Sequence, residues 1–126
     1  MTGTTLLLRQ VHPSFVQAGR VTSQAFRPTP KDESLLSVYD GDQITPEKSW
    51  FHFTSQKDCS SIGVMAVTVD ECAAEALTAR PDPEPFPEHA VIDFTGLTNN
   101  QCEKKCKKLR MKAEARGWQY QADFAN

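Results

Sequence analysis

The N-terminal third of the chain carries polar side chains of the types that bind small anionic ligands. Arg9 lies in an otherwise apolar run, and His12 follows it three residues later. Thr22 and Ser23 belong to the next β-prone segment. A guanidinium and an imidazole attract negative charge, and hydroxyl groups hydrogen-bond to a phosphate or a ribose. If the two segments pair in one sheet, the four side chains meet at its edge. If they do not, they are ordinary polar residues of strands, with Arg9 in an ion pair.

A second set of candidate residues is the run of cations between Thr98 and Arg116. This segment holds seven of the fourteen basic residues and only two acidic ones, a net charge of +5. Residues 1–97 hold seven bases and thirteen acids, a net charge of −6. Asp123 adds one more negative charge, so the formal total of −2 hides a strongly polarised molecule. A basic segment of this kind attracts an acidic protein surface or a nucleic acid backbone.

The four cysteines and three histidines are numerous enough for a metal site, but their spacing argues against one. Cys102 and Cys106 lie one helical turn apart, and no Cys-x-x-Cys pair occurs. Structural zinc sites usually take paired ligands from a tight turn. We therefore expect no metal and no cofactor. The sequence also lacks a glycine-rich phosphate loop and a nucleophile elbow, so it identifies no catalytic residues.

The elements that must position these residues follow from hydrophobic patterning and from turn signals. Strands are predicted at residues 6–11, 21–26, 35–39, 62–67 and 89–94. A short helix or turn is predicted at 13–18, and longer helices at 45–56, 68–77 and 98–116. Capping boxes begin the last two of these helices. Gly19 and Gly117 are expected to end the first and the last.

Three segments between these elements have no regular pattern. Residues 27–34 read as a loop, and residues 80–87, with proline at every second position, read as an extended connector. Trp118, Tyr120 and Phe124 are expected in a last strand or a strap on the body. The sequence predicts a single α+β domain over residues 1–126. Its mainly antiparallel sheet has about five strands, with two to three helices packed on one face.

Two expectations concern packing. In the last helix, one face within about 60° collects small and apolar residues and the opposite arc collects lysines. The expected inward residues are Cys102, Cys106, Leu109 and Ala113, and the expected outward residues are Lys104, Lys105, Lys107, Lys108 and Lys112. The main core is expected to join Trp50, Phe51 and Phe53 to Ile62, Val64 and Ile92, with Trp118 closing one end.

The composition is that of a soluble globular chain, with 39% hydrophobic and 24% charged residues. No apolar run approaches the roughly 20 residues of a membrane span. The segment before Arg9 has no basic region, so we expect no signal peptide, no membrane association and a cytoplasmic location. The cysteines would then be mostly reduced.

Residues 8–26, 36–40 and 89–94 resemble a group of small uncharacterised bacterial proteins. That resemblance implies a bacterial, cytosolic, self-contained domain. A strand with a polar residue, a short helix ending in glycine and a Ser/Thr strand also resemble the opening of some ADP-ribosyltransferase-like toxin domains. That second resemblance implies a nicotinamide–ribose cleft and usually a catalytic acid.

The leading hypothesis is a non-catalytic interaction module that docks an acidic partner through the lysines of the last helix. Low arginine content and the absence of aromatic residues among the lysines favour a protein over a nucleic acid. The alternative is a small enzyme or nucleotide-binding domain that uses Arg9, His12, Thr22 and Ser23. A pocket in which these four side chains converge would favour the alternative. The sequence leaves the oligomeric state open.

Overall fold

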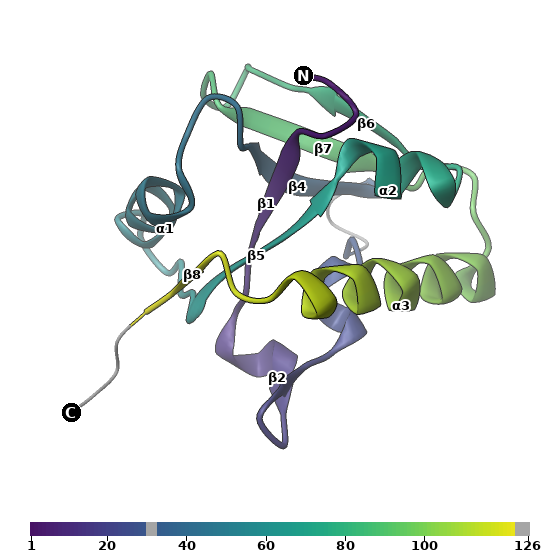
Figure 1. Cartoon of the computed structure of the whole chain (residues 1–126), viewed down its shortest axis with the longest axis horizontal. Helices are drawn as coiled ribbons and strands as arrows, with labels where there is room; N and C mark the ends of the chain where they lie inside the picture. The colour runs from purple at the N-terminus through teal and green to yellow at the C-terminus, as the bar shows by residue number, and fades with distance from the viewer. Residues whose placement is uncertain (30–32, 123–126) are drawn as a thin grey trace.

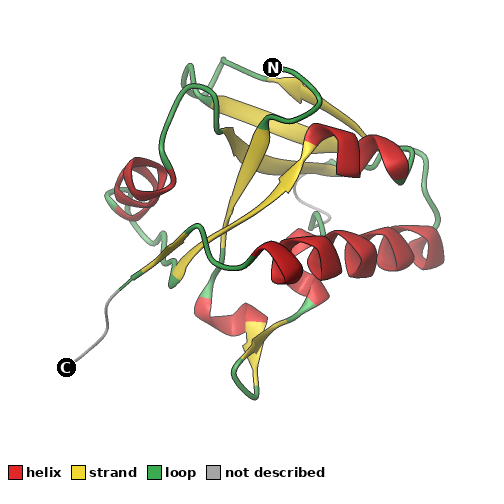
Figure 2. Cartoon of the chain, viewed as in Figure 1, coloured by secondary structure: helices red, strands yellow, loops and turns green. Residues whose placement is uncertain are grey.

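A curled, six-stranded antiparallel sheet is the centre of the computed structural model, which describes residues 1–29 and 33–122 (Figures 1 and 2). The strands follow the order β6-β7-β4-β1-β5-β8 across the sheet. They comprise β1 (Leu6–Gln10), β4 (Leu35–Asp40), β5 (Gly63–Thr68), β6 (Thr78–Pro81), β7 (His89–Asp93) and β8 (Tyr120–Gln121). The predicted α+β class is confirmed.

Helices cover both faces of this sheet, so the prediction that they all pack on one face is wrong (Figure 1). They are α1 (Pro46–Thr54), α2 (Val69–Ala74) and α3 (Asn99–Arg116). The helices α2 and α3 pack on one face over the larger core cluster, which includes Leu7, Ile92 and Leu109. The helix α1 packs on the opposite face over a smaller cluster that includes Leu8 and Val64. Neighbouring residues of β1 point to opposite faces, so Leu7 and Leu8 enter different clusters.

The helix boundaries follow the signals seen in the sequence. The hydroxyl oxygens of Thr68 and Thr98 each accept a hydrogen bond from the backbone N–H three residues later. In return, the backbone N–H of each threonine donates to the side chain of that later residue, which completes a capping box. Gly117, with a φ of 90°, ends α3 in the left-handed region that favours glycine. These two ends fix the start and the end of α3.

The N-terminal third differs from the sequence prediction. The predicted helix at 13–18 is a single 3₁₀ turn, η1 (Pro13–Phe15), followed by the hairpin of β2 (Val16–Gln17) and β3 (Arg20–Val21). Both residues of its turn, Ala18 and Gly19, have positive φ, as a tight hairpin requires. Gly19 was therefore a hairpin signal and not a helix stop.

The predicted strand at 21–26 is wrong over most of its length. It becomes a second 3₁₀ helix, η2 (Ser23–Phe26), in which Ala25 and Phe26 are both fully buried. Adjacent residues of a strand face opposite sides, so only a helical turn lets both side chains enter the same core. The Cys106 thiol donates a hydrogen bond to the Phe26 carbonyl oxygen at 3.0 Å and ties this turn to α3.

The expected aromatic core is also wrong. Phe51 is 56% exposed, because it lies about 100° around α1 from the residues that face the sheet. Trp50 and Phe53, three residues apart, are half-buried over the smaller cluster with Val64. Ile92 belongs to the larger cluster on the other face, and Trp118 packs at the margin of that cluster. Phe124 lies outside the described residues.

The strands β1 and β4 pair over only two positions, Leu7 with Asp40 and Leu8 with Tyr39. Each strand continues along its other neighbour: β1 pairs with β5 through Gln10, and β4 pairs with β7 back to Leu35. The two strands therefore separate beyond Leu8. The sheet curls at this point.

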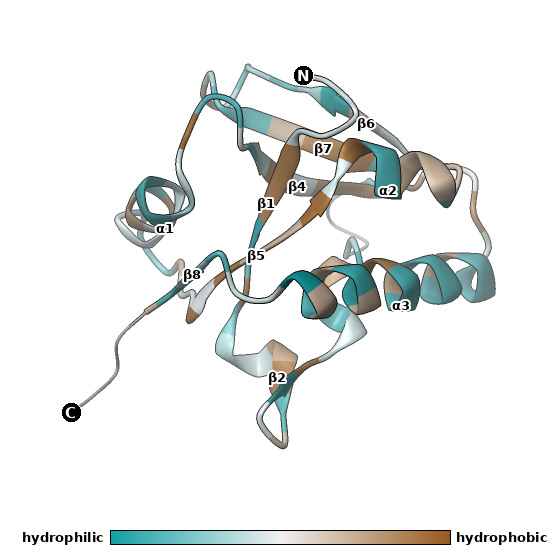
Figure 3. Ribbon diagram, in the orientation of Figure 1, coloured by the Kyte–Doolittle hydropathy of each residue, from teal (hydrophilic) through white to brown (hydrophobic). Residues whose placement is uncertain are grey.

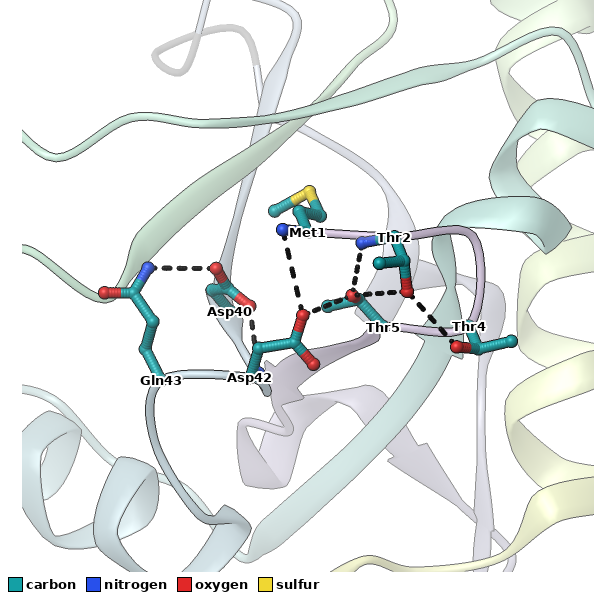
Figure 4. A network of polar contacts seen from close by, with 7 residues as sticks. All are labelled: Met1, Thr2, Thr4, Thr5, Asp40, Asp42 and Gln43. Atoms are coloured by element: carbon teal, nitrogen blue, oxygen red, sulfur yellow. Dashed lines mark hydrogen bonds and ion pairs between the residues drawn. The ribbon is translucent and has the colours of Figure 1, made fainter.

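A polar network fixes the closed end of this strand pair (Figure 4). The buried Thr5 hydroxyl donates to Asp42 Oδ2, and the Thr2 N–H donates to the Thr5 hydroxyl oxygen at 2.8 Å. Asp40 accepts from the Asp42 backbone N–H and from the Gln43 side chain, both at 2.9 Å. The turn after β4 is thus tied to the segment that leads into β1.

Two phenylalanines give a matched test of this packing. Phe26→Ala should lower the free energy of unfolding by about 3–5 kcal/mol, because Phe26 is fully buried in the larger cluster. Phe51→Ala should cost less than about 1 kcal/mol, because its ring is mostly exposed. Denaturant unfolding measures both values. Equal losses would contradict the finding that Phe26 of η2 is buried and that Phe51 of α1 is exposed.

Candidate functional site

The helix α3 is coloured mostly hydrophilic along its length (Figure 3). Cys106, Leu109 and Ala113 are buried as predicted, and Cys102 is half-buried. We define the lysine face as the four exposed lysines Lys104, Lys107, Lys108 and Lys112. The predicted outward residue Lys105 is half-buried, and its ammonium donates to the Glu75 carbonyl oxygen at the end of α2. A cation suits that end of a helix, so Lys105 has a structural contact.

Acidic side chains form ion pairs with only part of the lysine face. Lys107 lies 3.7 Å from Glu103 and Lys108 lies 3.7 Å from Glu75. Within the described residues, no hydrogen bond or ion pair is found for Lys104 or Lys112. Exposed ion pairs at such distances contribute little to stability. The lysine face therefore keeps most of its charge toward solvent.

The four polar residues predicted as a ligand site do not converge. The strand β1 pairs with β4 and β5, and β3 pairs with β2, so the two segments lie in different sheets. His12 is exposed and caps η1 by accepting from the Ser14 N–H at 3.0 Å. Thr22 donates to the Phe15 carbonyl oxygen at 2.9 Å. Thr22 and Ser23 line a shallow hollow beside Lys107 and Arg110 of α3, away from Arg9.

Arg9 lies where β1 and β4 separate. Its Nε donates to the Ala25 carbonyl oxygen at 2.7 Å, and its Nη1 donates to the Ser37 carbonyl oxygen at 2.9 Å. The side chain thus links β1 to η2 and to β4, and it replaces backbone bonds that the separated strands do not make. The sequence prediction placed Arg9 correctly in a strand but gave it the wrong neighbours.

A pocket of about 280 Å³ opens at this separation. Its floor is formed by β1 and β4, and its walls are formed by α1 and by the connector between β6 and β7. The lining residues are Leu8, Arg9, Gln10, Ser37, Val38, Tyr39, Phe53, Gln56, Pro85, Phe86 and His89. The volume is close to the lower end of pockets that bind small molecules, about 300 Å³.

Aromatic rings form much of the pocket wall. The Phe86 ring centroid lies 5.1 Å from that of Tyr39, 4.6 Å from that of His52 and 5.1 Å from that of His89. Burial raises the pKa of Tyr39, so its phenol stays neutral near pH 7. Phe86 is held between Pro85 and Pro87, whose fixed φ angles restrict this part of the connector. The wall is therefore largely preformed.

Ser37, His89 and Asp82 make a chain of contacts at the rim of the pocket. The Ser37 hydroxyl oxygen lies 3.1 Å from His89 Nε2. His89 Nδ1 lies 2.9 Å from the Asp82 carbonyl oxygen and 3.4 Å from the Asp82 carboxylate. These contacts could not be predicted from local sequence patterns, because 52 positions separate Ser37 from His89. Only the pairing of β4 with β7 brings them together.

The cysteines are free thiols in this fold. Burial raises the pKa of Cys72 to about 12, and it also raises the pKa of Cys106. Both thiols are therefore protonated and poorly reactive at neutral pH. Within residues 1–29 and 33–122, no group of three or more His, Cys, Asp or Glu side chains is placed to hold a metal ion.

Comparisons of the chain with protein families, with curated proteins and with solved structures found no match. None of the helices that the structure describes is long and apolar enough to cross a membrane. The function is therefore inferred from the geometry of the lysine face and of the pocket.

An ion pair joins β6 to β7, the two strands that flank the connector, and it gives a pH test. Hydrogen bonds from Thr95 and from Arg80, whose Nη1 lies 2.8 Å from Asp93 Oδ2, lower the pKa of Asp93 to about 2. Because the folded pKa lies below the ordinary value of about 3.9, the stabilisation is complete above that value. It is lost as the pH falls toward 2.

Asp93→Asn should therefore reduce the difference in unfolding free energy between pH 5 and pH 2. Denaturant titrations of both proteins at the two pH values measure that difference. The same difference in the variant and in the wild type would show that Asp93 does not contribute to acid sensitivity.

Proposed function

We propose that this domain docks on an acidic protein surface through the lysine face of α3. The observation that carries the proposal is the set of four exposed lysines on one side of an 18-residue helix, two of them without a described hydrogen bond or ion pair. Lys104 and Lys112 are separated by about 12 Å along the helix axis, at about 1.5 Å per residue. A partner can therefore contact several of these ammonium groups at once.

The helix that carries the lysine face is firmly held. Arg116 donates to both carboxylate oxygens of Glu71, at 2.9 and 3.0 Å, and also to the Ala66 carbonyl oxygen at 2.9 Å. Cys106 and Leu109 anchor the middle of the helix in the larger core cluster. Because the backbone is fixed, the ordering cost of binding falls mainly on the lysine side chains.

An exposed methionine favours a protein as the partner. Met111 is 60% exposed and lies on α3 next to Lys112 and one turn beyond Lys107 and Lys108. Methionine is enriched at protein interfaces, and its flexible side chain adapts to irregular apolar surfaces. The charged backbone of a nucleic acid does not favour contact with an apolar residue among the cations. In addition, α3 has no aromatic ring on which a base could stack.

The test is a charge reversal at Lys104 and Lys112, the two lysines without a described hydrogen bond or ion pair. Lys104→Glu with Lys112→Glu should weaken binding to poly-glutamate at low salt by at least about tenfold, since two favourable charge contacts become repulsive. Fluorescence anisotropy of labelled poly-glutamate measures the affinity. Lys48→Glu with Lys57→Glu is the matched control, because both lysines are exposed and lie away from α3, and the net charge changes by the same amount.

Three outcomes separate the possibilities. Loss of binding in the α3 variant alone supports an acidic protein partner. Equal loss in both variants would mean that only net charge matters, and it would contradict the proposal, as would failure of the wild type to bind. If duplex DNA binds instead, with a log–log salt slope of about −3 to −4 for three or four phosphate contacts, the partner is a nucleic acid.

A further inference from the structure

The contacts of Ser37, His89 and Asp82 have the order of a serine nucleophile, its histidine base and a group that orients the base. Such a constellation is recognised by its geometry and not by its order in the chain or by its fold. Ser37 Oγ lies 3.1 Å from His89 Nε2. His89 Nδ1 lies 2.9 Å from the Asp82 carbonyl oxygen and 3.4 Å from the Asp82 carboxylate. The first two distances are within the range for hydrogen bonds.

The contacts of His89 decide where its proton lies. A carbonyl oxygen can only accept a hydrogen bond, so the short contact to the Asp82 carbonyl requires that Nδ1 of a neutral ring carries the hydrogen. His89 Nε2 is then an acceptor, and the Ser37 hydroxyl must donate to it. This is the tautomer that a general base needs in order to take a proton from serine.

The sheet register places both groups on the pocket side. Tyr39 pairs with His89 and Ser37 pairs with Val91, so Ser37 and His89 are diagonal neighbours on one face. That face is the one covered by α1, and both residues line the pocket. His89 is only 8% exposed, whereas Ser37 is exposed to the pocket. The hydroxyl is therefore accessible to a bound molecule while its base is sheltered from water.

The remaining lining residues fit an uncharged ester with an apolar or aromatic group. Leu8, Phe53 and Phe86 offer apolar surface, and the cavity of about 280 Å³ limits the size of the molecule. Arg9 is the cation of the lining, and its Nη1 donates to the backbone carbonyl oxygen of Ser37.

We propose that this pocket hydrolyses small aryl or apolar carboxylic esters, with Ser37 as nucleophile and His89 as general base. Ser37 Oγ forms a bond to the ester carbonyl carbon as its proton passes to His89 Nε2. The bond to the leaving alcohol then breaks, and the alcohol takes that proton. Water, activated by the same imidazole, attacks the acyl-serine and releases the carboxylic acid with Ser37 restored. Asp82 is a positioning residue that holds His89.

This activity is separate from the proposed docking function, because the pocket and the lysine face lie on opposite faces of the sheet. The two proposals therefore fail independently. Lys104→Glu with Lys112→Glu should keep the ester hydrolysis of the wild type, and Ser37→Ala should keep the binding of poly-glutamate.

The first experiment labels the wild-type protein and so requires no folded variant. A small alkyl fluorophosphonate should form an O–P bond to Ser37 with loss of fluoride, and peptide mass spectrometry should find the added mass on the peptide that contains Ser37. Excess of a small aryl ester should slow the labelling. Labelling that is absent at Ser37, or that spreads equally over other serines, would overturn the proposal.

The second experiment follows hydrolysis of 4-nitrophenyl acetate. Ser37→Ala and His89→Ala should each lower kcat/KM by about 100-fold or more, the usual contribution of a nucleophile–base pair. Asp82→Asn should lower kcat by about tenfold with little change in KM, because the backbone carbonyl that holds Nδ1 remains.

Matched controls exclude hydrolysis by surface groups. Ser55→Ala and His12→Ala remove an exposed serine and an exposed histidine outside the pocket lining and should keep the wild-type rate. Thermal unfolding confirms that each variant is folded. The site is not catalytic if folded Ser37→Ala keeps the wild-type rate, or if His89→Ala and His12→Ala lose activity alike. In either case the Ser37–His89 bond only joins β4 to β7.

Discussion

The separation of β1 from β4 is the constraint on which the rest of the structure depends. Only two residue pairs join these central strands, and each strand then follows its other neighbour. The unmatched backbone groups need partners, and Arg9 supplies one by donating to the Ser37 carbonyl oxygen. The same side chain holds η2 through Ala25 and thereby fixes one margin of the larger core. A sheet paired along its full length would leave no space for the pocket.

Charge is distributed in a way that keeps the two candidate functional surfaces apart. The net positive helix α3 covers one face of the sheet, and its buried side is made of small residues that allow close packing. The pocket lies on the face covered by α1, among aromatic rings and polar groups, with Arg9 as the cation of its lining. A molecule held at one surface therefore does not compete for the side chains of the other.

The sequence predicted the elements whose signals are local and missed those that depend on distant contacts. Capping boxes at Thr68 and Thr98 located two helices, and apolar runs located the four central strands of the sheet. The segment 21–26 has a strand-like pattern, yet burial against α3 turns it into η2. Ser37 and His89 meet only through the register of β4 with β7, which no local pattern encodes. Arg9 was identified as a residue in need of a partner, but the identity of that partner depended on the separation of two strands.

The two ends of the sheet have a consequence for how the domain associates with other chains. An exposed strand edge can recruit another strand through its unpaired backbone groups. Here one edge strand, β6, ends in Pro81 and is followed by further prolines, which lack the N–H that strand pairing requires. The other edge strand, β8, comprises two residues in the part of the chain that the structure describes. Strand addition is therefore disfavoured at the β6 edge, and the described part of β8 offers few backbone groups for it.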